Sequence, residues 1–507
     1  MEKKKEILVI VGSLLIIILS VTLAYFTVQI IGKGKEISLD SANLKITFAS
    51  GGGNISSTNI EPGWSSGAST FTVKNESKDT YKYNIIIKDL INTFVTKGFL
   101  LYKITSTDGG YNMGDFVDVP KSTSATDTIL AYSVEIAKGV THTYTVEFKY
   151  LTSEEDQSDD MGRILSGTLY IEKGTDKPLT LAEKIIEDRT IETTPRGGAY
   201  NKVFTENTTG KLFQTAESIA GGEAKTVYYF AGAPTDNWVK FAGFYWRIIR
   251  TNHDGSVRLL YSGTATNTTS GYIGKSAFNS SYNSPKYAGY MYGTDGSLSE
   301  SRTNTNDSTI KTYIDNWYNT NLSSYTKYIS TEAVYCNDRQ LDSGQSWTFA
   351  TSPSSQINYI TFSRLDWNGD GANANPTYNC ANIKDAFSAS NTDAKLTYPI
   401  GLMTADEINI AGGLAYNNAP AYYYLNSAGG SVTGSTYWWS LSPMYWDGDS
   451  SGVWGVRGSG GPGYLGHGNV GNEGGVRPAI SLKTCALWTS GDGTPDAPYE
   501  ISTTSGC

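Results

Sequence analysis

Charged and chemically reactive side chains are scarce in this chain. Only 18% of its 507 residues are charged, three are histidine and four are cysteine. It contains no CxxC pair, no P-loop and no HExxH motif, so we expect neither an enzyme nor a bound metal or cofactor. The formal net charge of −9 disfavours nucleic acid as a partner.

Glycine and aromatic residues are abundant instead. The chain has 54 Gly, 35 Tyr and 11 Trp, a composition typical of extracellular, β-rich proteins. Its length is too great for one hydrophobic core and indicates two to four domains. We therefore expect a multi-domain protein with a membrane segment at 1–35, an all-β domain at 40–173, a helix and linker at 174–226 and an α+β domain at 227–507.

The N-terminus carries an export signal. An uncharged apolar run from Ile7 to Ile31 follows Lys3, Lys4 and Lys5, and it is long enough to span a bilayer. We expect display at the cell surface, with the residues after about 32 outside. A retained anchor and cleavage near Leu23–Phe26 both remain open.

The four cysteines allow three disulfide connectivities. Sequence order favours Cys336–Cys380 and Cys485–Cys507, and an exported chain permits both bridges. Free buried thiols are the alternative if the surroundings are not oxidising.

Short strands dominate residues 40–173. In the strongest, 140–151, Tyr144, Val146, Phe148 and Tyr150 share one face, and we assign His142 to the opposite, polar face. Similar runs predict a jelly-roll-like sandwich. They lie at 44–48, 69–75, 81–90, 99–105, 129–136 and 166–172.

Capping boxes mark two helices after residue 173. The pairs Thr180/Glu183 and Thr404/Glu407 each open a helix, the first ending near Arg189 and the second at Gly412. Residues 191–225 lack periodicity and are expected to be a connector. Strands are predicted at 226–230 and 240–250, and a third helix begins after Asp307 and Ser308.

A glycine-rich stretch near the C-terminus, flanked by apolar strands, is typical of recognition loops. We expect a loop that binds a protein or glycan ligand within Tyr445–Glu473, with Trp446 and Trp454 equally suited to packing beneath it. Arg477, Trp246, Trp317, Trp438 and Trp439 are assigned to the scaffold. The candidate ligand-binding residues are Tyr445, Trp446, Asp447, Asp449, Ser450, Trp454, Arg457, Ser459, Tyr464, His467, Asn469 and Asn472.

The segments YWWSLSP (437–443) and GVRPAISL (475–482) resemble the C-terminal end of C-type-lectin-like domains in bacterial surface proteins. Formylglycine-generating enzymes share this wider fold, but their active-site cysteine pair is absent here. Some members are variable proteins of diversity-generating retroelements, in which adenines of the gene are rewritten. The lack of Lys, Gln and Met between Tyr445 and Gly475 fits such rewriting, although an ordinary Gly/Ser/Asp loop also lacks Lys and Met.

The segments LDSANLKITF (39–48) and NIEPGWSSGASTFTVKNES (59–77) resemble the start of TasA/camelysin-type jelly rolls. This resemblance implies either a stalk or a fibre subunit. We expect an adhesin-like or receptor-like surface protein, with a matrix fibre carrying a passenger head, or a lectin-fold enzyme, as alternatives.

The segment Asp366–Gly371 matches the start of a calcium-binding loop. Position 12 of that loop is Thr377 rather than a carboxylate, so we interpret the segment as a polar turn, with calcium as the alternative.

Overall fold

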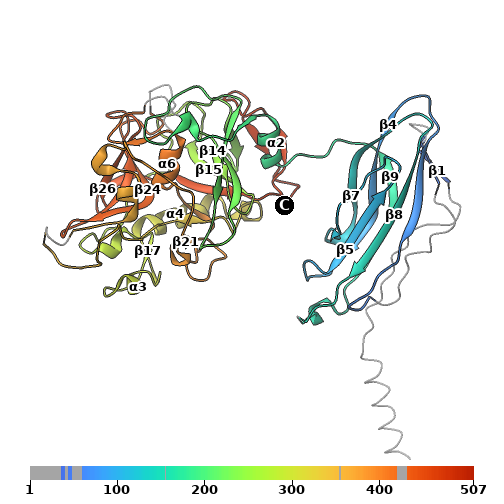
Figure 1. The fold of residues 1–507 in the computed structure, drawn as a ribbon, viewed down its shortest axis with the longest axis horizontal. Helices are drawn as coiled ribbons and strands as arrows, with labels where there is room; N and C mark the ends of the chain where they lie inside the picture. The colour runs from blue at the N-terminus through green and yellow to red at the C-terminus, as the bar shows by residue number, and fades with distance from the viewer. Residues whose placement is uncertain (1–35, 40–43, 48–59, 155, 353–355, 420–430) are drawn as a thin grey trace, which may run out of the picture. The chain divides into compact units, whose positions relative to one another are not determined.

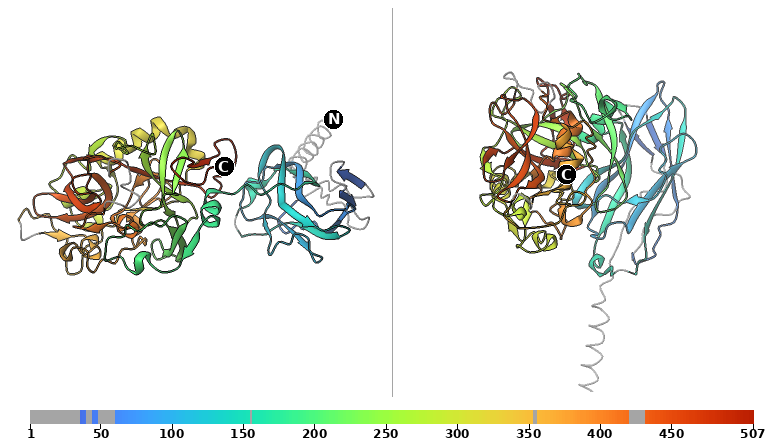
Figure 2. Two further views of the ribbon diagram at one scale, coloured as in Figure 1. Left: turned by 90° about the horizontal axis from the view of Figure 1, so that it is seen from above. Right: turned by 60° about the vertical axis from the view of Figure 1, so that its left-hand side comes forward.

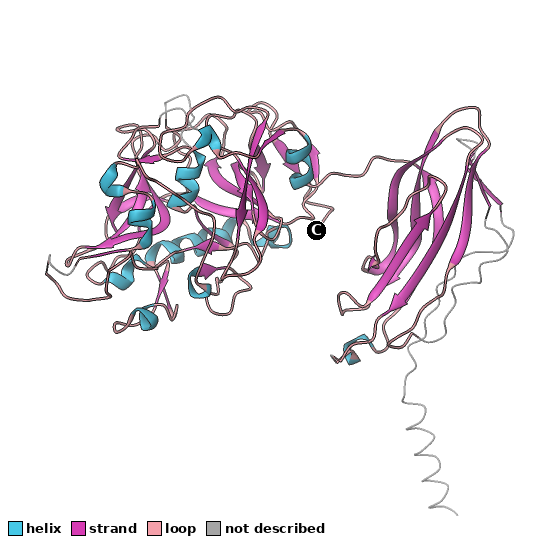
Figure 3. Ribbon diagram, in the orientation of Figure 1, coloured by secondary structure: helices cyan, strands magenta, loops and turns pink. Residues whose placement is uncertain are grey.

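The computed structural model describes residues 36–39, 44–47, 60–154, 156–352, 356–419 and 431–507. The chain divides after Lys177 into two compact units (Figure 1). Both are rich in β-strands, and each contains more than one sheet (Figure 3). The predicted apolar segment Ile7–Ile31 lies outside the described residues, and within the described ranges no helix is long and apolar enough to cross a membrane.

Two sheets of the first unit enclose one hydrophobic core, and the strands predicted between 44 and 172 are all present. One sheet has the order β1 (Glu36–Leu39), β2 (Leu44–Thr47), β3 (Ser69–Asn75), β8 (Thr141–Tyr150), β5 (Leu100–Ser106) and β6 (Val117–Asp118). The other has the order β7 (Ser122–Ile136), β4 (Tyr81–Asn92) and β9 (Leu165–Lys173).

The inward face of β8 is the predicted one, except that it also carries His142. Phe148 is buried, and it pairs across the sheet with Tyr102. The assignment of His142 to the polar face is wrong, because a period of two places residue 142 on the same side as Tyr144. The His142 ring is buried, and its Nδ1 lies 2.9 Å from the hydroxyl of Tyr83.

The second unit contains a ten-stranded sheet that begins inside the segment predicted to be a linker. The capping box at Thr180 opens α2 (Leu181–Glu187), as predicted. Residues 191–225, however, contribute β11 (Lys211–Glu217), which pairs along its length with β12 (Lys225–Tyr229). Pairing with a neighbour therefore stabilises a strand that has no regular polar–apolar alternation of its own.

The remaining strands of this sheet include a tight hairpin where one long strand was predicted. Ala242 and Gly243, with φ of 53° and 80°, form the two-residue turn that splits residues 240–250. The main path is β10 (Thr190–Glu192), β11, β12, β14 (Phe244–Thr251), β13 (Trp238–Phe241), β30 (Tyr499–Ile501) and β29 (Trp488–Ser490). β15 (Val257–Gly263), β28 (Pro478–Leu482) and β22 (Ile400–Leu402) extend it from β14.

A seven-stranded sheet contains most of the glycine-rich stretch. Its order is β16 (Lys275–Ala277), β27 (Glu473–Gly475), β24 (Trp438–Trp446), β25 (Ser451–Val456), β26 (Tyr464–Asn469) and β23 (Leu414–Ala415), with β20 (Ile357–Asn358) beside β24. Strands β24 to β27 of this sheet, orange-red to red in Figure 2, lie within the second unit. Small elements complete the unit: β17 (Met291–Tyr292), β18 (Asn306–Asp307), β19 (Tyr335–Cys336), β21 (Ala386–Phe387), α3 (Leu298–Ser301) and α5 (Ile360–Arg364).

Two further predicted helices are confirmed. Ser308 caps α4 (Thr309–Asn321), and the Thr404/Glu407 capping box opens α6 (Ala405–Ala411), which ends at Gly412. α6 lies between the two large sheets, because it contacts β24 while its Glu407 pairs with Arg250 of β14 (Figure 1).

Both predicted disulfides, Cys336–Cys380 and Cys485–Cys507, are formed. They indicate an extracellular or otherwise oxidising location. Trp246, Trp438 and Trp439 are fully buried, as predicted, whereas Trp317 is half-buried against the same core.

Candidate functional site

The glycine-rich segment forms strands rather than the predicted loop. Gly455 pairs with Gly466, and Gly468 pairs with Val453, so these glycines share one face of β25 and β26. Aromatic rings from neighbouring strands occupy the space of the missing side chains. A Cβ atom added to Gly468 or to Gly474 would lie within 2.8 Å of the Trp439 ring. Glycine is tolerated here because these rings cover its backbone.

The same glycines leave a groove of about 240 Å³ on the sheet. Its floor contains Gly455, Gly466 and Gly468, which have no side chains to fill it. The polar side chains of Tyr437, Arg457, His467 and Asn472 surround this floor. The complete lining is Tyr437, Gly455, Val456, Arg457, Gly466, His467, Gly468 and Asn472.

Arg457 supplies the charge in this groove. Its guanidinium lies over the ring of Tyr464, with 4.3 Å between the guanidinium carbon and the ring centroid. The side chain is exposed, and it makes no hydrogen bond or ion pair within the described part of the chain. Stacking on an aromatic face holds a guanidinium in place while leaving its N–H edges free for a ligand.

Tyr437 supplies an unpaired hydroxyl. Its ring packs edge-on against Trp439 at a centroid distance of 5.1 Å, and its Oη is buried without a hydrogen bond to any described residue. Burial, reinforced by the charge of Glu473, raises the pKa of Tyr437 to about 12. The hydroxyl therefore keeps its proton at neutral pH and can donate it to a bound group.

His467 closes another side of the groove. Its ring packs against Trp367 and Tyr445 at centroid distances of 5.0 and 5.2 Å. Desolvation of the ring by these contacts, followed by the charge of Arg457, lowers the pKa of His467, although Asp447 acts in the opposite direction and part of the side chain is exposed to solvent. The imidazole is therefore neutral at pH 7.

Of the predicted binding residues, the groove brings together Arg457, His467 and Asn472. Trp446 and Trp454 are fully buried, and the indole N–H of Trp454 donates to Thr361 Oγ1 at 3.0 Å, so both belong to the core. Six other predicted residues are exposed or half-buried outside the groove lining: Tyr445, Asp447, Asp449, Ser459, Tyr464 and Asn469.

The predicted acidic residues shape a turn. The Asp447 carboxylate accepts hydrogen bonds from the backbone N–H groups of Asp449, at 2.9 Å, and of Ser450, at 2.7 Å. Ser450 is buried, contrary to its assignment as a contact residue, because its hydroxyl also lies against Asp447. These residues hold the β24–β25 connection in shape.

The segment that resembles a calcium loop also forms a turn. Asp366 Oδ2 accepts a hydrogen bond from the backbone N–H of Asn373 at 2.7 Å. Among the described residues, no group of three His, Cys, Asp or Glu side chains is arranged to hold a metal ion.

Beside this turn, Trp367 packs on Tyr416, a 42% exposed residue whose φ of 58° is rare for an aromatic side chain.

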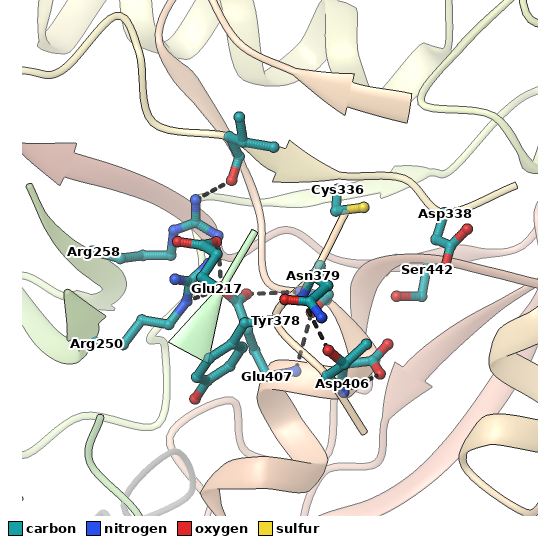
Figure 4. Close-up of a pocket in the computed structure, with 13 residues that line it drawn as sticks. Glu217, Arg250, Arg258, Cys336, Asp338, Tyr378, Asn379, Asp406, Glu407 and Ser442 are labelled. Carbon is teal, nitrogen blue, oxygen red and sulfur yellow. Dashed lines mark hydrogen bonds and ion pairs between the residues drawn. The ribbon is translucent and has the colours of Figure 1, made fainter. Parts of the chain in front are cut away.

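A buried charge cluster lies elsewhere in the unit, between β11, β14, β15 and α6. Arg250 contacts Glu217 and Glu407, each at 2.8 Å, and Arg258 contacts Glu407 at 2.6 Å (Figure 4). The adjoining polar cavity measures about 10 Å³, room for no more than one water molecule. Because these charges neutralise one another and leave no space for a substrate, we assign the cluster a structural role.

Sequence reasoning missed Tyr437 and the buried cluster. Tyr437 comes directly before β24 and two residues before Trp439, and the rings of both lie against Gly468 and Gly474 on the glycine-lined face. The cluster joins residues up to 190 positions apart (217 to 407), and no local pattern marks it.

Comparison with protein-family models, curated proteins and solved structures finds no significant match to this chain.

Proposed function

We propose that this is a ligand-binding protein displayed at the cell surface, of adhesin-like or receptor-like type, and that it binds its ligand in the groove over β25 and β26. The groove carries the proposal. It combines a guanidinium and a buried hydroxyl that have no hydrogen-bond partner among the described residues with a floor of glycines. A concave site with a few convergent polar groups is the usual form of a binding site.

The folds of the two units accord with such a role. We propose that the first unit is a jelly-roll-like stalk, supported by its two sheets around one core. We propose that the second unit is a C-type-lectin-like head, supported by the resemblance of its closing strands and by its mixture of sheets with α4 and α6. The residues 1–35 would anchor or export the chain, and the two disulfides agree with an external location.

A binding role fits better than catalysis. A dense set of titratable side chains surrounds the cavity beside Arg250 and Glu407, but there the charges pair with one another and the space is about 10 Å³. In the groove, the described lining contains His467 but no serine, threonine or cysteine that it could activate. Nucleophilic catalysis by a histidine-activated hydroxyl or thiol needs such a residue.

Filling the groove tests this proposal. Asn472 is exposed at the groove wall, so Asn472→Trp should block the space without disturbing the core. Purified full-length protein is applied to a printed array of glycans and peptides. We expect the wild type to bind a defined subset and Asn472→Trp to lose that binding.

A matched control introduces the same bulk elsewhere. Asn316 is exposed on α4 and does not line the groove, so Asn316→Trp should bind like the wild type. Binding that survives in Asn472→Trp, or an array on which the wild type binds nothing, would contradict the proposal.

A further inference from the structure

We propose that the groove binds a sugar ring that carries a carboxylate, as in a uronic acid of an acidic polysaccharide. The inference rests on the proposed binding function and adds the chemical class of the ligand. It follows from the charge, the unpaired hydroxyl and the shape of the groove, which are independent observations.

The charge of the groove selects an anion. Among the described residues of the lining, Arg457 is the one with a full charge at neutral pH, because this lining contains no carboxylate and no lysine and desolvation of the His467 ring favours its neutral form. The carboxylates of Asp447 and Glu473 lie outside the lining. The guanidinium is already positioned over Tyr464, so little side-chain freedom is lost when it pairs with a ligand. A planar, two-pronged donor matches a carboxylate better than it matches a hydroxyl.

The hydroxyl of Tyr437 favours a second polar group on the same ligand. Its Oη has no partner among the described residues and stays protonated at neutral pH, because its pKa is about 12. A buried donor without an acceptor is costly, and a bound ligand that presents an acceptor removes this cost. The ring and hydroxyl oxygens of a sugar are such acceptors, and Asn472 can pair with further hydroxyls from the groove wall.

The shape favours a ring over an extended peptide. β25 is paired on both sides, by β24 and β26. β26 is paired along one side by β25, and on its other side β23 pairs with Tyr464 and Leu465. Among the described strands, β25 therefore offers no free edge for a peptide to extend the sheet. The volume of about 240 Å³ lies below the roughly 300–1,000 Å³ of pockets that enclose whole drug-sized ligands, so it suits one ring of a longer chain.

A matched pair of sugars tests the inference. Glucuronate and glucose differ in one group, a carboxylate in place of a hydroxymethyl, and binding of each to the full-length protein is measured by ligand-observed NMR titration. We expect glucuronate to bind about tenfold more tightly than glucose. Arg457→Gln should reduce this preference to less than about twofold, because it removes the charge and the fork of donors.

Two further variants separate the role of the Tyr437 hydroxyl from a general effect of positive charge on the protein. Tyr437→Phe keeps the ring against Trp439 and should weaken both sugars by a similar factor, because it removes only the hydroxyl. Lys395→Gln removes a positive charge from an exposed residue outside the groove lining and should change neither affinity. A thermal unfolding midpoint equal to that of the wild type shows that each variant is folded.

Equal binding of the two sugars, a preference that survives in Arg457→Gln, or binding of neither sugar overturns the acidic-sugar assignment. If the wild type binds peptides on the array and Asn472→Trp does not, the acidic-sugar assignment is also overturned. The groove would then remain a binding site, but for a peptide. The failure of this inference is thereby distinct from the failure of the proposed function.

Discussion

Glu407 Oε1 lies 2.8 Å from Nε of Arg250, and both side chains are almost completely buried. The same oxygen accepts a hydrogen bond from Arg258 at 2.6 Å, while the other oxygen caps α6 through the backbone N–H of Thr404 at 3.0 Å. One carboxylate thus connects a helix to two strands of the ten-stranded sheet. Two buried guanidinium groups depend on it for charge compensation.

Removing that charge should destabilise the second unit strongly. Glu407→Gln retains the size and the helix cap but leaves the arginines short of one negative charge. We expect a loss of about 3–5 kcal/mol in the free energy of unfolding, measured with urea. The control Glu500→Gln removes a carboxylate from an exposed pair with Lys240 and should cost less than about 1 kcal/mol. Equal effects would show that the cluster contributes no more than a surface pair.

Acid should weaken the same cluster through Glu217. Burial alone would raise the pKa of Glu217, but Arg250 and the hydrogen bond with His253 outweigh it and lower the pKa to about 2. Because the folded-state pKa is below the unfolded value of 4.5, the ionised carboxylate stabilises the fold above that pH. Stability should fall between pH 4.5 and about 2, and Glu217→Gln should flatten this part of the unfolding profile. An unchanged profile in the variant would contradict the assignment.

In the first unit, Phe148→Ala should lower the free energy of unfolding by about 3–5 kcal/mol. Phe148 is 2% exposed and contributes to the core between the two sheets. Thr141→Ala, at an exposed position of the same strand, serves as the control and should be nearly neutral. A neutral Phe148→Ala would mean that the core tolerates a cavity at this point.

The glycines beneath the aromatic rings should resist even a methyl group. A Cβ atom on Gly468 would lie 2.8 Å from the Trp439 ring, which is buried and cannot move freely. We expect Gly468→Ala to cost about 1–3 kcal/mol by overpacking. Gly460 has no neighbouring atom within 4 Å of such a Cβ, so Gly460→Ala should be neutral or slightly stabilising. Urea unfolding of the two variants makes the comparison.

Local signals in the sequence predicted much of the fold. Capping at Thr404 depends on Glu407 three residues later, and the alternation in β8 depends on every second residue, so both are readable from a short window. The disulfides were predicted from chain order and from the expected location. These features need no knowledge of distant partners.

The candidate site depends on residues that are distant in sequence and on how neighbouring strands are aligned with one another. Glycine has low strand propensity, so the sequences of β25 and β26 resemble a loop, and the rings of Trp439 and Tyr464 that cover these glycines do not show in a local pattern. The position of Tyr437 in the groove depends on which glycines lie opposite β24. Trp446 and Trp454 were equally compatible with contact or core, because a tryptophan's burial is decided by packing that no short window contains.

The last prediction concerns diversification of the C-terminal segment. If the gene is a retroelement target, a near-copy of the codons for about Tyr445–Gly475 should lie beside a reverse transcriptase gene, with differences at template adenines. The structure restricts where such variation is tolerated. Exposed side chains on the groove and its surroundings can change with little effect on stability, usually within about ±0.5 kcal/mol. These positions are Asp449, Arg457, Ser459, His467 and Asn472.

The buried and ring-covered positions should be spared. Trp446 and Trp454 fill the core, while a Cβ on Gly455 would meet the backbone oxygen of Trp438 at 2.9 Å and one on Gly466 would meet the Tyr464 ring at 2.8 Å. Gly455 and Gly466 should therefore stay glycine even where adenines permit change, because substitution there disturbs the floor of the groove. Sequencing the locus and its near-copies makes the comparison. If the locus has no template repeat and no reverse transcriptase gene, the protein has a fixed binding specificity. Variation concentrated at Gly455 and Gly466 would contradict the prediction that the floor of the groove is preserved.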